Sequence, residues 1–360
     1  MFKCVTRAWR LLPAALMITA TASAAGKLKV VTTTTDLRSI VESIGGDKVE
    51  VASLGTGHED PHFIDAKPSC MVLARDADLW VRIGLELEIG YENLVIDGSR
   101  NPKIRIGTPG HLDASEGVLR LELPTGKVDR SMGDIHPQGN PHYWLDPLNM
   151  RIVAKNVAAR LSKLDSANPD YYAANLKTFQ NKLDEAMFGP KLLAAGATAA
   201  GSPDQGGAKL WALLLKNELD NFVKDHGGDA ALGGWFGAMR PLRGTKILTY
   251  HRSWSYFTNR FGLEVSAELE PKPGIEPTPA HLSQVVDLVA KDKVRFLLME
   301  PFYSRQAPDW LANKTGIKVV DVANSVGGQP AATDYISMID QVVKRCVDAC
   351  GTATGSPASN

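Results

Sequence analysis

Histidine side chains placed after predicted strands are the residues of this chain best suited to chemistry. The chain contains eight histidines, and two of them, His62 and His251, lie just beyond stretches that predict β-strands. Glu300 directly follows a third such stretch, and His142 lies in an aromatic and proline-containing segment of the first half. Ligands of open parallel sheets bind beyond the carboxyl ends of the strands. We therefore expect imidazoles and a carboxylate from both halves of the chain to meet in one crevice.

Two or three imidazoles together with one carboxylate form a ligand set for a divalent transition metal. Imidazole nitrogen is a favoured ligand of zinc, whereas carboxylate and carbonyl oxygens suit manganese better. The residue types therefore favour zinc and leave manganese as the alternative. Because ligand imidazoles must be neutral, we expect metal affinity to fall as the pH drops through their titration range.

The segment His58-Glu59-Asp60-Pro61-His62 has the letter pattern of zinc proteases. That chemistry requires both histidines on one face of a helix, with the glutamate as general base. Pro61 disfavours helical backbone at Asp60, and the preceding Gly-Thr-Gly indicates a loop. We therefore reject a protease motif here.

The remaining histidines divide into two groups. His111, His226 and His281 do not closely follow a predicted strand, and we interpret them as hydrogen-bonded structural residues. His58 lies in the same loop as His62, and His136 lies in the turn-rich segment that precedes His142. His58 and His136 are therefore further candidate ligands.

The elements that must position these residues follow a parallel α/β pattern. Short stretches rich in β-branched residues alternate with helical patterns, as in sheets with helical crossovers. The expected strands cover 27–34, 49–54, 79–83 and 103–107 in the first half, and 245–250, 294–299 and 318–322 in the second. Two α/β lobes are therefore predicted.

A nearly continuous helical pattern over 147–193, interrupted at Asn168-Pro169, separates the two halves. We expect this segment to be a rigid connector between an N-terminal lobe over 25–146 and a C-terminal lobe over 194–350. An Ala-, Gly- and Ser-rich stretch over 194–208 predicts a loop. The small polar residues 351–360 predict a disordered tail.

The N-terminus has the pattern of a cleaved export signal. Three basic residues precede an apolar run over 11–20, which is too short to span a bilayer, and Ala-Ser-Ala follows at 22–24. We therefore expect 1–24 to be removed and the mature chain to be soluble in the periplasm. Cys4 lies within the charged region of the signal, which argues against a lipid anchor on this residue.

The charge composition argues against a nucleic-acid-binding protein. The 360 residues include 40 basic and 40 acidic ones, and loss of three basic residues with the signal leaves the mature chain slightly acidic. A nucleic-acid-binding protein would need a basic face. The length and a hydrophobic fraction of 44% fit two globular domains.

The mature chain retains three cysteines, Cys70, Cys346 and Cys350. An odd number leaves at least one thiol unpaired. Cys346 and Cys350 are four residues apart on a predicted C-terminal helix and so share one face. Whether they form a disulfide stays open, and metal binding by this pair is a further alternative.

Motifs spread over nearly the whole mature chain resemble one protein family. They are Asp60-Pro61-His62, Lys67-Pro68-Ser69, Ala77-Asp78-Leu79, the segments 84–88 and 141–147, His251 with Tyr256-Phe257, the segments 261–263 and 274–279, and Gly327-Gly328. In their order and spacing, these motifs resemble the periplasmic zinc- and manganese-binding solute-binding proteins of ABC importers.

The resemblance implies two lobes with small parallel sheets, joined by one long rigid connector helix, with metal in the cleft between the lobes. The three imidazole positions of the family match His62, His142 and His251. Its fourth ligand is usually a carboxylate in the loop after the last strand, where this chain has Asn324. Our first choice for the fourth ligand is Glu300, because of its charge and its position after a strand. The alternatives are Asn324, Asp321, His136, His58 and water.

The resemblance further implies binding rather than catalysis. We expect a monomer that captures Zn²⁺, with Mn²⁺ as the alternative, and delivers it to the membrane permease of an ABC importer powered by a separate ATPase. Two other classes stay open: a periplasmic zinc chaperone without a transporter, and a zinc hydrolase. A hydrolase needs a general base near the metal, and the one base that a motif suggests, Glu59, belongs to the rejected pattern.

Overall fold

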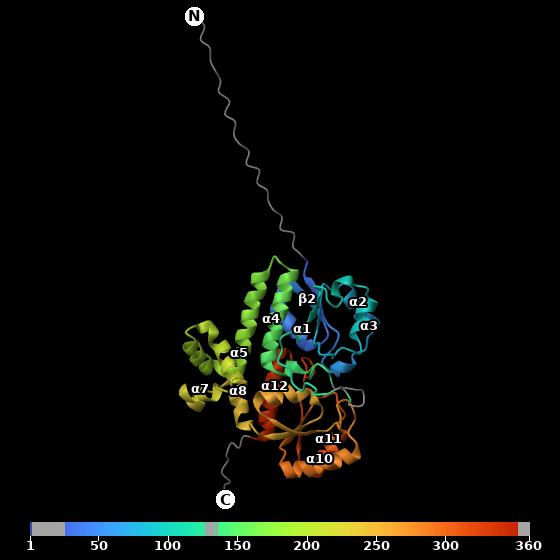
Figure 1. Cartoon of the computed structure of the whole chain (residues 1–360), viewed down its shortest axis with the longest axis vertical. Helices are drawn as coiled ribbons and strands as arrows, with labels where there is room; N and C mark the ends of the chain where they lie inside the picture. The colour runs from blue at the N-terminus through green and yellow to red at the C-terminus, as the bar shows by residue number, and fades with distance from the viewer. Residues whose placement is uncertain (2–25, 127–132, 134–135, 352–360) are drawn as a thin grey trace.

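The structure, a computed structural model, describes Met1, residues 26–126, Gly133 and residues 136–351 (Figure 1). The expected export signal over 1–24 and the expected tail over 351–360 lie outside the described residues, apart from Met1 and Gly351. Within the described parts of the chain, no helix combines the length and the apolar character needed to cross a membrane.

Each lobe is built on a parallel sheet of four strands. The first sheet has the order β2-β1-β3-β4 and the second the order β6-β5-β7-β8, so the two sheets share one topology. The strands are β1 (Leu28–Thr32), β2 (Val49–Ser53), β3 (Leu79–Arg82), β4 (His111–Asp113), β5 (Lys246–Thr249), β6 (Glu264–Glu268), β7 (Phe296–Met299) and β8 (Lys318–Asp321). The predicted architecture of two small parallel sheets is confirmed.

The register brings the carboxyl ends of neighbouring strands together. In the first sheet, Thr32 at the end of β1 pairs with Ser53 of β2 and Val81 of β3. In the second sheet, Thr249 at the end of β5 pairs with Glu268 of β6 and with Leu298 of β7. Loops that leave these ends therefore start from one edge of each sheet, where side chains of different loops can meet.

Helices cover both faces of each sheet, as burial of both sides requires for parallel strands. On one face of the first sheet a buried cluster contains residues of α2 (Pro68–Arg75) and α3 (Glu92–Ser99), and on one face of the second sheet a cluster contains residues of α10 (Pro279–Asp292) and α11 (Gln306–Thr315). The other face of each sheet belongs to a single large core. That shared core holds the two lobes together.

The helices of the shared core lie between and beside the lobes (Figure 1). They are α1 (Thr35–Gly45), α4 (Pro147–Leu164), α5 (Pro169–Ala200), α6 (Gly206–Leu215), α7 (Leu219–Asp225), α8 (Gly234–Met239), α9 (Ser255–Phe261) and α12 (Tyr335–Cys350). The expected connector over 147–193 thus consists of two helices, α4 and α5, which pack against each other. They are separated where Asn168-Pro169 indicated an interruption, because Pro169 begins α5.

Two local expectations from the sequence are wrong, and one strand was not expected. The fourth strand of the first sheet is His111–Asp113, whereas 103–107 lies in a 3₁₀ helix and a turn, where the Asn101 side chain accepts from the Lys103 backbone N–H. The stretch 194–208 is helical up to Ala200, because its alanines favour a helix, and after two residues a 3₁₀ helix (Pro203–Gln205) leads into α6. Strand β6 was not expected, since its sequence Glu-Val-Ser-Ala-Glu has no apolar run.

Candidate metal centre

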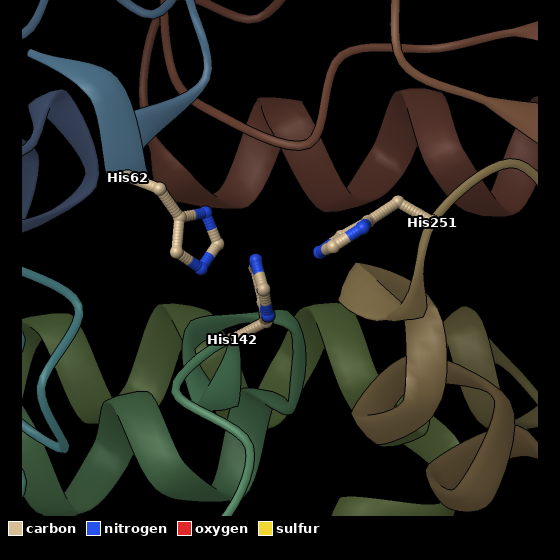
Figure 2. Close-up of side chains that lie close together, drawn as sticks. All are labelled: His62, His142 and His251. Carbon is tan, nitrogen blue, oxygen red and sulfur yellow. The ribbon is translucent and has the colours of Figure 1, made fainter. Parts of the chain in front are cut away.

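Three histidines from distant parts of the chain converge between the lobes. His62, His142 and His251 are buried, and one ring nitrogen of each lies within 4.8 Å of the others. Figure 2 shows the three imidazole rings directed toward one another from separate segments. Among the described residues, this is the one group of three or more His, Cys, Asp or Glu side chains with so close a spacing. The three residues that the sequence singled out are therefore brought together.

His62 is held by the side chain two residues before it. Asp60 has extended backbone, with φ −66° and ψ 120°, and a short 3₁₀ helix begins at Pro61. Oδ1 of Asp60 accepts the backbone N–H of His62 at 2.9 Å and lies 2.7 Å from Nδ1 of His62. Because Asp60 is not helical and His58 is exposed, the protease pattern is not formed, as predicted.

His142 is held in the same way. Oδ1 of Asn140 accepts the backbone N–H of His142 at 2.9 Å and lies 2.9 Å from its Nδ1. Asp60-Pro61-His62 and Asn140-Pro141-His142 thus form one local arrangement twice, with a side-chain oxygen that orients the ring two residues later. Sequence reasoning missed both oxygens, although the repeated spacing was a readable signal.

His251 is the second residue after β5, and its partner follows another strand. Oε2 of Glu270, just beyond β6, lies 2.6 Å from Nδ1 of His251, and both side chains are buried. Burial alone would lower the pKa of His251, but the hydrogen bond and the charge of Glu270 outweigh it and raise the pKa. Gly274 fixes the same carboxylate through its backbone N–H at 2.9 Å.

The three oxygens define the chemistry of the centre. An Nδ1–H that donates to an oxygen leaves Nε2 unprotonated, with its lone pair free for a metal ion. Burial, and then the charges of His62 and His251, hold the pKa of His142 well below its usual range. Burial would raise the pKa of Asp60, but its bonds to His62 outweigh burial and lower the pKa to about 2, so the carboxylate stays ionised.

His136 lies beside this group. Its Nε2 is 3.2 Å from Nε2 of His62, and it lines a cavity of about 40 Å³ together with His142 and His251. Two nitrogens bound to zinc at about 2.0–2.1 Å in a tetrahedral site lie roughly 3.3 Å apart. Burial, and then the charges of His62 and His251, lower the pKa of His136 to about 4, so its ring is neutral at neutral pH.

The other fourth-ligand candidates have different surroundings. Glu300 is buried, and its Oε1 accepts from the Ser253 hydroxyl, while Oε2 has no hydrogen-bond partner among the described residues. Burial raises the pKa of Glu300 to about 7. Oδ1 of the buried Asn324 likewise has no partner in the part of the chain that the structure describes. Asp321 forms an ion pair with Arg305, and His58 is exposed.

The histidines interpreted as structural are hydrogen-bonded elsewhere. Nε2 of His111 lies 3.0 Å from Oε1 of Glu92, and the rings of His226 and His281 lie within hydrogen-bond distance of the backbone carbonyls of Phe222 and Glu268. The cysteines Cys70, Cys346 and Cys350 are free thiols in the structure. Neither group adds a residue to the metal centre.

Comparison with known proteins gives one consistent family. The profile described as zinc-uptake complex component A, periplasmic (ZnuA), matches residues 30–187 and 237–349. The chain is 33% identical over 286 residues to the manganese ABC transporter substrate-binding lipoprotein PsaA of Streptococcus pneumoniae, covering 78% of this chain and 74% of that protein. It is 32% identical over 300 residues to the metal ABC transporter substrate-binding lipoprotein FimA of Streptococcus parasanguinis, covering 82% and 79%.

The fold is also shared with a solved structure. A crystal structure of ZnuA superposes with a TM-score of 0.65 at 22% identity, covering 90% of this chain and all of that chain. The family match leaves out 188–236, which contains α6 and α7. Proteins of this family are transport binding proteins and not enzymes, which excludes the zinc hydrolase. The chain belongs to the ZnuA family, the metal-binding solute-binding proteins of ABC transporters.

Proposed function

We propose that this chain captures zinc outside the cytoplasm on His62, His142, His251 and His136 and delivers it to the permease of an ABC importer. The observation that carries the proposal is the convergence of the three buried imidazoles, each with Nδ1 held by an oxygen. Zinc is the cargo here and has no catalytic task. A separate ATPase would supply the energy for transport.

The donor set supports zinc over manganese. Imidazole nitrogens suit zinc, whereas manganese prefers carboxylate and carbonyl oxygens. The three converging ligands are all imidazoles, and the position after the last strand holds the neutral Asn324. Some relatives are named for manganese and the family profile for zinc, so the names alone do not choose between the metals. We therefore base the choice of zinc on the side chains of this chain.

For the fourth ligand, His136 has more support than Glu300. Its Nε2 lies 3.2 Å from Nε2 of His62, close to the spacing of two nitrogens on one zinc ion. Glu300 remains the alternative, because its buried Oε2 is free of hydrogen bonds to described residues. The two assignments differ in the charge of the bound centre, since four neutral imidazoles leave the full charge of the cation.

The proposed location is the periplasm, with a cleaved export signal over 1–24 and no lipid anchor. The support is the small-residue pattern Ala-Ser-Ala at 22–24 and the position of Cys4 inside the charged region. Several relatives are named lipoproteins, so an anchored form is the alternative. We propose that the protein acts as a monomer, with the permease as its partner.

A competition titration tests the proposed cargo and ligands together. Protein purified without added metal is titrated with zinc and with manganese against a chromophoric chelator. We expect one zinc per chain and at least a hundredfold preference for zinc. His136→Ala should weaken zinc binding by more than Glu300→Gln does, and the reverse order would assign the fourth position to Glu300. Equal or tighter binding of manganese would overturn the choice of zinc.

A further inference from the structure

A buried carboxylate in the first lobe accepts a hydrogen bond from a loop of the second lobe. Asp36 lies in the first turn of α1, and its Oδ1 accepts the backbone N–H of Val326 at 3.0 Å. The two residues are 290 positions apart, and Asp36 is fully buried. Val326 belongs to the loop between β8 and α12. This hydrogen bond therefore joins the lobes inside the shared core.

A series of contacts connects the loop at Val326 to His142. The carbonyl of Asn324, two residues before Val326, accepts the indole N–H of Trp144 at 2.7 Å. The ring of Trp144 lies against that of His142, with centroids 5.1 Å apart. The carbonyl of Trp144 in turn accepts from the Tyr335 hydroxyl at 2.7 Å. A displacement of the loop at Val326 would therefore move the indole that supports His142.

A second path leads to the loop that carries His62. A Cβ atom on Gly57 would lie 2.2 Å from the carbonyl oxygen of Val326, and the φ of Gly57 is +85°. A Cβ atom on Gly328 would lie 2.6 Å from the carbonyl oxygen of Gly57. The loop before His62 and the loop after β8 thus pack backbone against backbone, with space only for glycine. The position of Val326 consequently limits the position of the His62 loop.

The chemistry of Asp36 is unusual for a residue with a packing role alone. Burial raises its pKa to about 7, against the opposing effect of hydrogen bonds from the Val326 backbone and the Ser325 side chain. A carboxyl group costs more free energy at a buried position than an apolar side chain of similar size. Its presence there is explained by the acceptor that it offers to the Val326 N–H, which would otherwise be buried without a partner.

We propose that Asp36 is a positioning residue for the metal centre, which fixes His62 and His142 relative to each other by tying the 324–328 loop to α1. Asp36 touches neither the metal nor its ligands. Removing its acceptor loosens the loop, and the two imidazoles lose their fixed spacing. Since metal affinity depends on preorganised ligands, binding weakens although every ligand is retained. This inference rests on the proposed metal-binding function.

Two substitutions at one position test the role. Asp36→Ala removes the acceptor, whereas Asp36→Asn keeps an oxygen that can accept the Val326 N–H. We expect Asp36→Ala to weaken zinc binding at least tenfold and to alter the visible spectrum of the cobalt(II)-loaded protein, which reports ligand geometry. Asp36→Asn should stay within threefold of the unchanged protein and keep its spectrum. Equal affinities and spectra for all three proteins would overturn the proposal.

A control separates positioning from loss of stability. Asn101 is buried in the first lobe and donates to the carbonyls of Ala74 and Ala77, away from the metal centre. Asn101→Ala should lower stability and leave zinc affinity and the cobalt spectrum unchanged. If it weakens zinc binding as much as Asp36→Ala does, the positioning role is refuted.

A second variant covers the case in which Asp36→Ala does not fold. Gly328→Ala separates the same two loops without touching Asp36, and we expect at least a tenfold loss of zinc affinity. Unchanged affinity of that variant would contradict the proposal. If the unsubstituted protein binds no zinc, the proposed function itself fails. If it binds zinc and the variants bind equally well, only the positioning role fails.

Discussion

Replacing Glu270 by glutamine tests how the protein tunes a ligand from outside the metal centre. Oε2 of Glu270 lies 2.6 Å from Nδ1 of His251 and accepts the Gly274 N–H at 2.9 Å. Glutamine keeps the shape of this side chain and an acceptor oxygen but removes the charge. The substitution therefore weakens the hydrogen bond that orients His251 and retains every proposed metal ligand.

The size of the effect follows from the contact. A hydrogen bond to a charged group contributes about 1.5–3 kcal/mol, roughly twice a neutral one. Loss of the charge-assisted part should therefore cost about 1.4 kcal/mol, or roughly tenfold in affinity. That value lies at the lower end of the 10–100-fold loss typical of changes to groups that orient a metal ligand. We expect Glu270→Gln to weaken zinc binding about tenfold at pH 8.

Lowering the pH should weaken zinc binding by the unsubstituted protein more than zinc binding by Glu270→Gln. Glu270 raises the pKa of His251 in the metal-free protein, so protons compete with zinc from a higher pH than for an ordinary histidine. In Glu270→Gln this pKa falls, and the loss of affinity begins at a lower pH. The affinities of the two proteins should therefore converge as the pH drops from 8 to 5.5.

The assay is a chelator competition titration at half-unit pH intervals. Glu268→Gln is the matched control. Glu268 lies two residues before Glu270, and its side chain pairs with Arg252 at 3.4 Å and, among the described residues, with no candidate ligand. We expect this control to stay within twofold of the unsubstituted protein at every pH. Parallel pH curves for Glu270→Gln and the unsubstituted protein would refute the reasoning, as would equal effects of the two substitutions.

Three further perturbations have expected outcomes. His142→Ala should abolish tight zinc binding in metal analysis of the purified protein, and a retained stoichiometry of one zinc per chain would remove His142 from the centre. Arg260→Ala should lower the free energy of unfolding in urea by about 3–5 kcal/mol, because it leaves the buried carboxylate of Asp146 without its bidentate partner at 2.8 and 2.6 Å; a loss below about 1 kcal/mol would contradict this. Stripping zinc with a chelator should cost about 2.7 kcal/mol of stability relative to protein in zinc at a hundred times its dissociation constant, whereas identical denaturation curves would speak against a site in the folded protein.

Several strands of the two sheets, and the site residues that follow them, could be predicted because the local sequence patterns agree with the topology of a parallel sheet. The runs of β-branched and apolar residues in β1, β5 and β7 indicated buried parallel strands, and the rule for carboxyl ends then located His251 and Glu300. Strand β6 has only partly buried or exposed residues and no apolar run, so its pattern was too weak to read. The strand His111–Asp113 has three residues and is defined by pairing with β3, which local sequence does not specify.

Some of the groups that orient the ligand histidines could have been predicted from the sequence, and others could not. Asp60 and Asn140 stand two residues before the histidines that they hold, so the repeated Asx-Pro-His spacing contained the information. Glu270 is 19 residues from His251 and depends on the unrecognised β6. His136 was a candidate because it precedes His142 in a turn-rich segment, but its approach to His62 joins residues 74 positions apart, which no short-range pattern predicts.

X-ray absorption at the zinc edge is the most direct test of the central claim that His62, His142 and His251 hold the transported metal. We expect one zinc per chain, with four nitrogen or oxygen neighbours at about 2.0–2.1 Å and outer-shell scattering from at least three imidazole rings. His142→Ala, loaded at a zinc concentration high enough to fill its weakened site, should show one imidazole ring fewer. Sulfur neighbours at about 2.3 Å, or scattering from fewer than three imidazoles, would contradict the account.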